Sequence, residues 1–267
     1  MDKETFQEII LTHYKNSGRT FPWRKNINPW GVLVSEFMLQ QTQTERVVDY
    51  WKRWMKKWPS AKDLAKADLE EVLREWSGLG YNRRARFLKQ AAEKIVSDFN
   101  GEVPQTPTQL KTLPGIGEYS SGAIACFAYN VPCVFIETNI RRVILHFFFQ
   151  DKTDVKDSEL FPIIEQTLHK GNPRVWYWAL MDYGSELKKV TINPNRRSAH
   201  YTKQSKFEGS LRQVRGAIIK TLANEGPAKI DELHEKTGFE YDRLNKALEK
   251  LHHESMVAEI DGVYKIK

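Results

Sequence analysis

The sequence predicts an all-α main domain followed by a small winged-helix-like unit of mixed α and β structure. Apolar residues recur at helical spacing through about the first two hundred residues, without the alternating pattern that is typical of strands. Beyond Gly209, three more helical segments precede two short β-prone runs, which the hairpin-turn pair Asp261-Gly262 joins. Because 40% of the 267 residues are hydrophobic, the chain can bury the core of one large or two ordinary domains.

The helices of the main domain are predicted from apolar faces and from capping residues. Phe6, Ile10 and Tyr14 share one face of the first helix. Ser60 and Asp68 are typical N-cap residues, and the helix that Asp68 opens ends at Gly78. The other predicted helices begin at residue 32 or cover 47–55, 83–99, 106–112, 120–129, 138–149, 159–168 and 173–183.

Composition divides the chain into a helical domain over residues 1–186, a connector over 187–209 and the winged-helix-like unit over 210–267. Between residues 187 and 207 there are six Lys or Arg and no acidic residue, which indicates a basic connector. In the last part we expect helices over 211–223, 230–237 and 241–253, and strands over 256–260 and 263–266. In a winged-helix fold the third of these helices is the recognition helix, here with Arg243, Lys246 and Lys250. An ordinary solvated helix explains the same segment equally well.

Net charge and cysteine content limit the partners and the cofactors. A formal net charge of +7 favours a polyanionic partner. No apolar run approaches the roughly 18 residues of a membrane span, and the charged N-terminus is unlike a secretory signal, so a cytoplasmic, nucleoid-associated location is expected. The two cysteines, Cys126 and Cys133, are too few for a disulfide framework or for a four-thiolate metal site. We therefore expect no metal and no iron–sulfur cluster, and both cysteines buried as small apolar residues.

A glycine-rich turn and two carboxyl side chains are the candidates for chemistry. Gly115-Ile116-Gly117 lies between two predicted helices, where backbone N–H groups at a helix N-terminus can bind phosphate. Taken alone, such a turn is more often a plain helix connector. Glu137 follows an apolar run and opens a helix, so the helix dipole is expected to hold its carboxylate ionised. Glu36 is surrounded by apolar residues of its own helix, so desolvation is expected to keep it protonated. One neutral and one charged acid suit the cleavage of an N-glycosidic bond.

Four motifs occur in order within the first 183 residues. They are FPWR at 21–24, VSEFMLQQTQ at 34–43, GLGY at 78–81, and LPGIG at 113–117 followed by Tyr119. This set resembles the MutY-type adenine DNA glycosylases of the helix-hairpin-helix superfamily. The resemblance implies a two-lobed helix-hairpin-helix glycosylase fold that flips a base out of duplex DNA.

The resemblance also implies roles for individual residues. Glu36 would protonate the departing adenine and later help water to attack, and Glu137 stands at the position of the family's essential aspartate. Supporting active-site groups would be Tyr119, Asn139 and Arg19. Bifunctional relatives carry a lysine at the position of Tyr119, so weak or no lyase activity is implied. The implied DNA contacts are Gln40, Gln41 and Tyr81, inserted into the duplex, and Gly115, Ile116 and Gly117, which would grip phosphate.

The sequence departs from the family pattern in three places. The family's four cluster-binding cysteines are missing after residue 184, and the resemblance leaves Lys188, Lys189, Arg196 and Arg197 to bind phosphate electrostatically instead. Only a short unit stands where the family has a domain that checks for 8-oxoguanine opposite adenine. Glu137 replaces aspartate, and a carboxylate misplaced by about 1 Å can cost about a hundredfold in rate.

The sequence therefore predicts a monofunctional DNA glycosylase of base excision repair. We expect a monomer that acts on double-stranded DNA with a mismatched or damaged base, with adenine opposite guanine or 8-oxoguanine as the leading substrate. A thymine or uracil mismatch glycosylase remains open, because relatives of that kind also have Tyr at the position of Tyr119. A non-catalytic protein that binds DNA lesions or structures remains open too, supported only by the substitution at Glu137.

Overall fold

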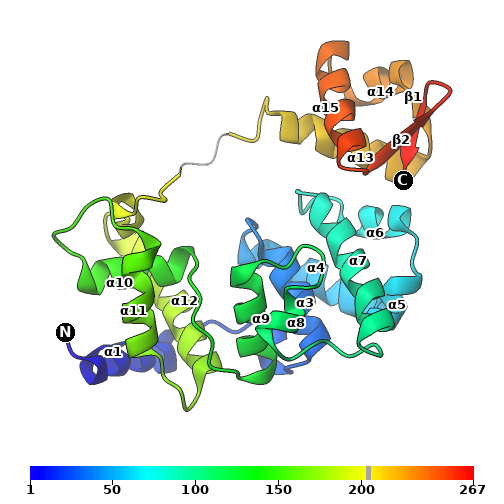
Figure 1. The fold of residues 1–267 in the computed structure, drawn as a ribbon. Helices are drawn as coiled ribbons and strands as arrows, with labels where there is room; N and C mark the ends of the chain where they lie inside the picture. The colour runs from blue at the N-terminus through cyan, green and yellow to red at the C-terminus, as the bar shows by residue number, and fades with distance from the viewer. Residues whose placement is uncertain (203–205) are drawn as a thin grey trace. The chain divides into compact units, whose positions relative to one another are not determined.

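The computed structural model describes residues 1–202 and 206–267, which form two compact units, each drawn from several parts of the chain (Figure 1). The first unit contains residues 1–32, 105–112 and 116–202. The second contains residues 33–104, 113–115 and 206–267, so the C-terminal part of the chain belongs to the same unit as the helices of residues 33–104. The part of the predicted connector at 203–205 lies outside the described residues.

The first unit is a helical bundle in which the two ends of the main domain meet. Helix α1 packs against α12, which lies more than 150 residues later in the chain. Phe6 of α1 is fully buried, and its ring meets the edge of Trp176 of α12 at a centroid distance of 5.6 Å. The elements of this unit are α1 (Lys3–Ser17), α2 (Pro22–Lys25), α8 (Pro107–Leu110), α9 (Glu118–Tyr129), α10 (Thr138–Phe148), α11 (Asp157–Thr167), α12 (Pro173–Val190) and the 3-10 helix η1 (Pro194–Arg197).

The second unit begins within a helix and contains a second helical core. Helix α3 (Pro29–Leu39) enters it at Leu33, and α4 (Thr44–Lys57), α5 (Ala61–Lys66), α6 (Leu69–Trp76) and α7 (Arg83–Asp98) follow. Three tryptophans fix α4 to α6: the Trp54 ring lies 4.6 Å from Trp58 and 5.5 Å from Trp76, both edge to face. Such aromatic pairs add packing energy beyond the area they bury.

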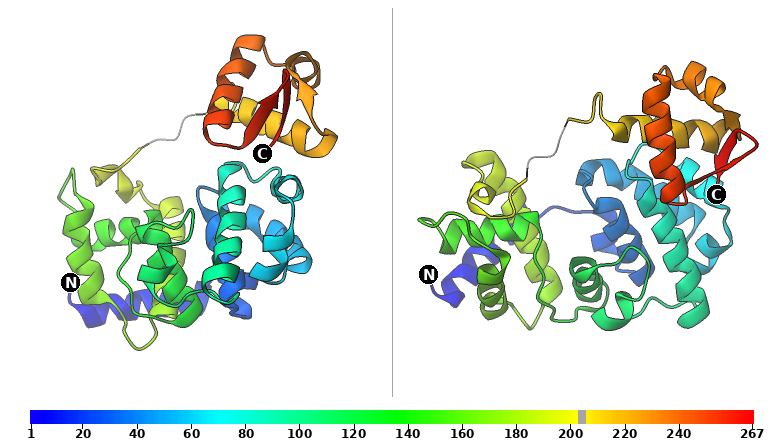
Figure 2. Two further views of the ribbon diagram at one scale, coloured as in Figure 1. Left: turned by 45° about the vertical axis from the view of Figure 1, so that its right-hand side comes forward. Right: turned by 45° about the horizontal axis from the view of Figure 1, so that its top comes forward.

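The C-terminal part of the second unit is a winged-helix-like arrangement. It contains α13 (Leu211–Glu225), β1 (Ala228–Lys229), α14 (Ile230–Thr237), α15 (Tyr241–His253), β2 (Val257–Ile260) and β3 (Val263–Ile266). The strands form an antiparallel sheet in the order β1-β3-β2, with Val257 opposite Ile266 (Figure 2). Asp261 and Gly262 have φ of 51° and 76°, as the tight turn of a two-residue hairpin requires. Helix α13 packs against α6, where Arg74 Nε donates to the Ala223 carbonyl at 3.0 Å.

The predicted all-α main domain and the C-terminal winged-helix-like unit are confirmed. Several helix boundaries and short elements differ from the prediction. Helix α12 continues to Val190 instead of ending near residue 183, because Leu187 is buried and extends its apolar face. The short elements α2 and β1 were not predicted, since two to four residues show no periodicity.

No described helix combines the length and the apolar composition that a bilayer span needs.

Helices α10 and α12 approach each other closely at Gly184. A Cβ atom built on this glycine would lie 2.4 Å from the carbonyl oxygen of Asn139, in the first turn of α10. The missing side chain therefore lets α12 support the N-terminal end of α10, where Glu137 and Asn139 lie.

We expect Gly184→Ala to lower the free energy of unfolding by about 2 kcal/mol, because the backbone contact must open. Gly216 of α13 is the matched control, since nothing lies within 4 Å of a Cβ built there. Gly216→Ala should raise the stability by up to about 1 kcal/mol, the difference in helix propensity. Thermal or urea unfolding measures both. Equal effects of the two substitutions would contradict the close approach.

Candidate active site

The candidate general acid, Glu36, lies in a helix that is otherwise apolar. It is only 7% exposed, and its neighbours Val34 and Phe37 are at most 1% exposed. The burial predicted from the sequence is therefore confirmed. Burying a carboxyl group costs stability that an apolar residue would not cost, so a buried acid in such a helix is a candidate for chemistry rather than for packing.

The C-terminal end of α3, just after Glu36, is held by the buried side chain of Arg84 from α7. The Nη1 atom of Arg84 donates to the carbonyl oxygens of Phe37 at 2.8 Å, Met38 at 2.9 Å and Gln40 at 2.6 Å. The last carbonyls of a helix have no partner within the helix, so this guanidinium supplies the missing donors. The chain at Gln40 and beyond is thereby fixed after the helix ends.

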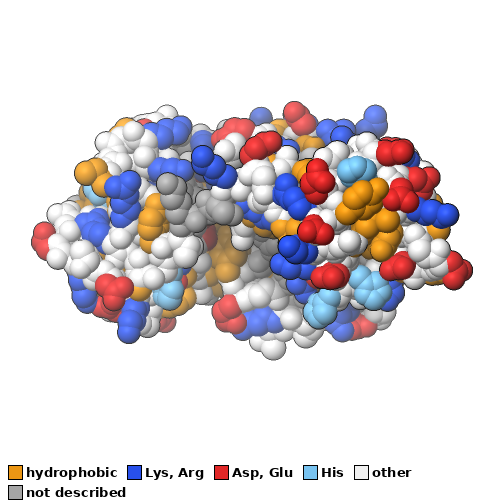
Figure 3. Space-filling model, turned by 90° about the horizontal axis from the view of Figure 1, so that it is seen from above, with side chains coloured by type: hydrophobic (Ala, Val, Ile, Leu, Met, Phe, Trp, Pro, Cys, Tyr) orange, Lys and Arg blue, Asp and Glu red, His pale blue; other side chains and the backbone are white. Residues whose placement is uncertain are grey.

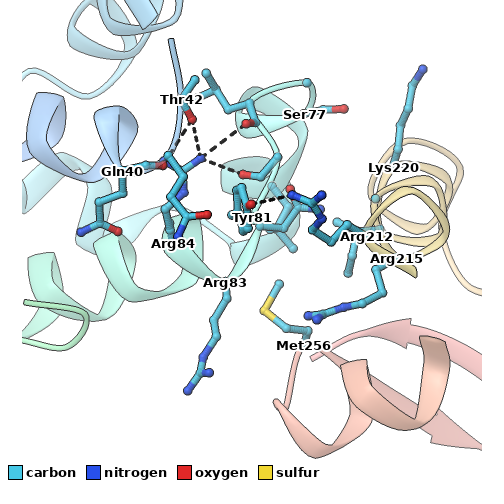
Figure 4. A pocket seen from close by; sticks show the side chains of 18 of the residues that line it. Gln40, Thr42, Ser77, Tyr81, Arg83, Arg84, Arg212, Arg215, Lys220 and Met256 are labelled. Atoms are coloured by element: carbon cyan, nitrogen blue, oxygen red, sulfur yellow. Dashed lines mark hydrogen bonds between the residues drawn. The ribbon is translucent and has the colours of Figure 1, made fainter. Parts of the chain in front are cut away.

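The same guanidinium holds the turn between α6 and α7. Its Nη2 atom donates to the carbonyl oxygen of Gly80 at 3.0 Å and to the hydroxyl of Thr42 at 3.0 Å (Figure 4). Burial lowers the pKa of Arg84 to about 10, so the group still carries its charge at neutral pH. Arg84 thus joins two of the four sequence motifs, at 34–43 and 78–81.

Two of the predicted DNA-contacting residues in these motifs have a left-handed backbone conformation. Gln41 has φ of 56° and Tyr81 has φ of 50°, and the Tyr81 side chain is 37% exposed. Non-glycine residues in this region are strained and collect at functional sites. Gly78 is required beside them, because φ is 98° and a Cβ would lie 2.2 Å from the Tyr50 hydroxyl.

The glycines of the predicted phosphate-binding turn have different constraints. Gly115 has φ of 80°, and a Cβ there would lie 2.7 Å from Phe87 and 2.9 Å from Phe37. Gly117 is the N-cap of α9 with φ of −98°, and a Cβ there would meet nothing within 4 Å. Packing within the chain therefore requires the first glycine but not the second. Ile116 is only 6% exposed, so any DNA contact at this position comes from the backbone.

The second candidate carboxylate, Glu137, caps the N-terminus of α10. Its Oε1 atom accepts the backbone N–H of Asn139 at 2.7 Å and of Ile140 at 2.9 Å, and the Nδ2 atom of Asn139 donates to Oε2 at 3.3 Å. Asp, Asn and Ser usually fill this cap position. Glu137 fills it by folding its longer side chain back over its own helix.

The expectation that the helix end simply holds Glu137 ionised needs correction. Desolvation raises the pKa of Glu137 above its ordinary value, and this effect exceeds the lowering by the two backbone hydrogen bonds and by Arg142 and Arg141. The sequence could show the helix start but not the burial, which depends on tertiary packing.

Asn139 and Arg142 continue the network from Glu137. Arg142, only 3% exposed, donates through Nη1 to Oδ1 of Asn139 at 2.6 Å and through Nε to Oδ1 of Asn193 at 3.0 Å. Arg142 also donates to the carbonyl of Gly184 in α12. Asn139 therefore has a fixed orientation, with its Nδ2 directed at Glu137.

The other two predicted active-site residues have different surroundings. Tyr119, in the first turn of α9, is half-buried, and its ring meets the edge of Phe135 at a centroid distance of 5.8 Å. Phe135 lies two residues before Glu137. Arg19 forms an ion pair with the buried Asp182, its Nε 2.9 Å from Oδ1. The structure gives Arg19 a partner in α12, and no described hydrogen bond links it to Glu137 or Asn139.

The four basic residues predicted to bind phosphate divide into two groups. Lys188 and Lys189 are exposed in the last turn of α12, and Arg196 is exposed in η1. Arg197 is instead engaged within the unit, because it donates to the carbonyl oxygens of Leu145 at 3.0 Å and of Gln150. Its hydrogen bonds satisfy carbonyls at the end of α10, which the sequence did not indicate.

The segment after α12 does not fit an iron–sulfur cluster. Such a cluster needs four thiolates, whereas Cys126 lies in α9 and Cys133 in the loop before α10. The described residues of the segment are fixed by amide hydrogen bonds instead: Asn195 Nδ2 donates to the Thr138 carbonyl at 2.9 Å, and Asn193 accepts from Arg142.

Three residues that organise these sites were not among the predicted site residues: Arg84, Arg142 and Asp182. Arg84 shares the apolar face of α7 with Leu88 and Ile95, at helical spacing, and a charged residue on a buried face indicates a buried partner. Asp182 accepts hydrogen bonds from Arg19 and Arg24. The same periodicity places Asp182 between apolar residues of α12.

Comparisons with known proteins agree with the motifs. Residues 34–163 match the family model described as HhH-GPD superfamily base excision DNA repair protein. An adenine DNA glycosylase of Mycobacterium tuberculosis is 33% identical over 281 residues, which cover 95% of this chain and 90% of that protein. An adenine DNA glycosylase of Rattus norvegicus is 38% identical over 196 residues, 69% of this chain but only 38% of that longer protein.

Two solved structures have the same fold. A thermostable thymine-DNA glycosylase is 26% identical with a TM-score of 0.63, over 68% of this chain and 86% of that one. Endonuclease III in a non-covalent DNA complex is 22% identical with a TM-score of 0.54, over 70% and 86% of the two chains. The second likeness concerns the fold alone.

Arg84→Met should destabilise the second unit by about 3 kcal/mol, because several buried carbonyls lose their donor together. Arg83→Met is the matched control, since Arg83 precedes Arg84 in the same helix and is exposed. Its effect should stay within about 0.5 kcal/mol. Urea unfolding followed by circular dichroism measures both. Similar losses for the two variants would mean that Arg84 does not hold α3 and the 78–81 turn.

Proposed function

Because the chain belongs to the HhH-GPD superfamily of base excision DNA repair proteins, we propose that it is a monofunctional adenine DNA glycosylase. The substrate is adenine mispaired with guanine or 8-oxoguanine in duplex DNA. The observation that carries the chemistry is the burial of Glu36, an acid with 7% exposure in an apolar helix. The choice of adenine is supported by the Mycobacterium tuberculosis adenine DNA glycosylase, to which the similarity extends over 95% of this chain.

In the proposed reaction, Glu36 is the general acid. It transfers its proton to a ring nitrogen of adenine while the bond between that base and the sugar C1′ breaks, and the bonding electron pair leaves with the base. The resulting carboxylate then accepts a proton from the water that attacks C1′. The products are free adenine and an abasic site, and Glu36 returns to its protonated state.

Glu137 is proposed to stabilise the positive charge that develops on the sugar. The helix holds Oε1 through two backbone N–H groups, and Asn139 fixes the direction of Oε2. A carboxylate held in this way needs no rearrangement when the charge appears. The network from Asn139 to Arg142 and Asn193 supports a site adapted to Glu rather than a decayed one.

The proposed DNA contacts that enter the duplex come from the two motifs that Arg84 holds. Gln40, Gln41 and Tyr81 enter the duplex beside the target base, and the backbone of 115–117 binds a phosphate. Lys188, Lys189 and Arg196 add cations that face solvent. Arg19 is proposed to position α12 through Asp182 rather than to contact the substrate.

A thymine or uracil mismatch glycosylase is the second candidate function. The thymine-DNA glycosylase structure, with 26% identity and a TM-score of 0.63, favours it. The adenine assignment is preferred because the similarity to adenine DNA glycosylases includes the C-terminal part of the chain, whereas the match to the thymine enzyme covers 68%.

An excision assay tests the proposed function. Duplexes with single A:8-oxoG, A:G, T:G, U:G and hypoxanthine pairs are incubated with excess protein, with and without alkali, and the released base is identified. We expect adenine release, with strand breaks only after alkali because Tyr119 cannot form a Schiff base. Glu36→Gln should lower the single-turnover rate at least about a hundredfold while DNA affinity stays within about twofold.

Other outcomes of this assay have distinct meanings. Release of thymine or uracil but not adenine would establish the second candidate. No release from any duplex would indicate a non-catalytic DNA-binding protein. Strand cleavage without alkali would contradict the monofunctional mechanism.

The raised pKa of Glu137 predicts a pH dependence. Only the ionised form can stabilise a cationic sugar, and this form is lost as the pH falls through the raised pKa. The pH profile of kcat/KM reports groups of the free enzyme. On its acid side, kcat/KM should therefore fall at a pH above 4.5, the ordinary pKa of Glu. Glu137→Gln should be slow and lack this fall. An acid limb that is unchanged in Glu137→Gln would assign the titration to another group.

A further inference from the structure

A groove within the second unit joins the two Arg84-held motifs to the C-terminal part of the chain. Its volume is about 1180 Å³, and it is lined mainly by residues within 40–46, 77–87, 207–220 and 251–256. We call it the α13 groove, because α13 forms the wall that faces the 78–81 turn (Figure 4). The sequence indicated no role for α13.

The lining of the α13 groove is strongly basic. It contains six Lys or Arg side chains and a single carboxylate, that of Glu254. Arg215 of α13 pairs with this carboxylate, which neutralises it. On the right-hand part of the face in Figure 3, by contrast, Lys and Arg side chains lie among acidic ones. The side chains that line the groove therefore carry a net positive charge.

Helix α13 touches one of the predicted DNA-inserting residues directly. The Nη1 atom of Arg212 donates to the Tyr81 hydroxyl at 2.7 Å, and its guanidinium lies 5.7 Å from the centre of the Tyr81 ring. Lys220 lines the same groove two helical turns further along α13 and is exposed. A phosphate backbone that passes Tyr81 would next meet these two cations.

The composition of the groove fits nucleic acid better than an acidic protein segment. Gln40, Gln41 and Gln43 offer amide groups, and Phe207 is 56% exposed at its rim. Cations combined with amides and an exposed aromatic ring are typical of surfaces that follow a nucleic-acid strand.

The predicted recognition helix α15 is less suited to this task. Of its three basic residues, Arg243 donates to the Gly209 carbonyl at 2.7 Å and lies 5.3 Å from the Phe239 ring centre. Lys246 and Lys250 are exposed on a helix that also carries Asp242 and Glu249. These mixed charges are ordinary for a solvated helix face.

We propose that the α13 groove is a DNA-binding site, in which Arg212 and Lys220 contact the phosphodiester backbone beside the residues that enter the duplex. The C-terminal unit then binds DNA through its first helix, without inserting α15 into a groove of the duplex. From the proposed function, this inference assumes only that the chain binds duplex DNA. The C-terminal unit would help to hold the DNA, and it need not recognise the lesion.

The test is the affinity of the full-length protein for an undamaged 30-base-pair duplex, measured by fluorescence anisotropy between 50 and 200 mM salt. The double variant Arg212→Glu, Lys220→Glu should weaken binding at least about tenfold. The slope of log K against log salt concentration should become smaller by about two, because two phosphate contacts are lost. The matched control is Lys246→Glu, Lys250→Glu on α15, which should change the affinity by less than about twofold. Lys220→Gln, at an exposed position, should reduce the slope by about one and leave the thermal midpoint unchanged.

The remaining outcomes overturn the proposal. A larger loss in the α15 variant would identify α15 as the DNA-binding helix. Equal affinities for all variants would show that the C-terminal unit does not hold DNA. Binding of poly-glutamate that depends on Lys220, with DNA binding unaffected, would identify an acidic protein segment as the ligand. Because no base is excised from this duplex, these results do not depend on whether adenine is the substrate.

Discussion

The hydrogen bonds of one buried guanidinium hold the second unit in its functional arrangement. Arg84 satisfies carbonyls at the end of α3 and in the 78–81 turn, two segments separated by about forty residues of chain. A lysine has three donors on one atom and could not reach both segments in the same geometry. The strained backbone at Gln41 and Tyr81 is maintained because this side chain binds Gln40 and Thr42 on either side of Gln41, and Gly80 directly before Tyr81. Glu36 directly precedes the residues whose carbonyls Arg84 binds, so the candidate acid and the DNA-inserting residues share one support.

A second buried guanidinium has a similar part in the first unit. Arg142 connects Asn139 to Asn193 and to α12, so the cap formed by Glu137 rests on a network of neutral amides. The segment after α12 is tied onto α10 because Asn193 accepts a hydrogen bond from Arg142, while Asn195 and Arg197 donate to α10 carbonyls. The family that the four motifs resemble usually binds an iron–sulfur cluster through four cysteines in this segment. In this chain, several hydrogen bonds of modest strength stand where the family has cysteine–iron bonds. Such a hydrogen-bond network is cooperative, so the loss of one partner weakens the others.

The proposed role of the C-terminal winged-helix-like part depends on which residues its helices contact. Its sheet and helices form a winged-helix-like fold, a fold that often implies a recognition helix in the major groove. The contacts of α13 with α6 and of Arg212 with Tyr81 instead place its first helix beside the predicted DNA-inserting residues. A fold therefore limits which surfaces exist, while the neighbours of each surface decide what it can bind.

The sequence by itself determined most of the helices and the hairpin, because apolar periodicity, caps and turn pairs act over a few residues. Its four motifs indicated the family. It also identified Glu36 as buried, since apolar residues surround it on almost every side of its helix. Only the tertiary structure decided where Arg84, Arg142 and Asp182 find their partners. Each of these residues has a partner 40 or more residues away in the chain, and periodicity shows that a charge is buried without showing what it meets. The raised pKa of Glu137 and the basic lining of the α13 groove also depend on the tertiary structure. Both result from residues that are distant in the chain and that folding brings together.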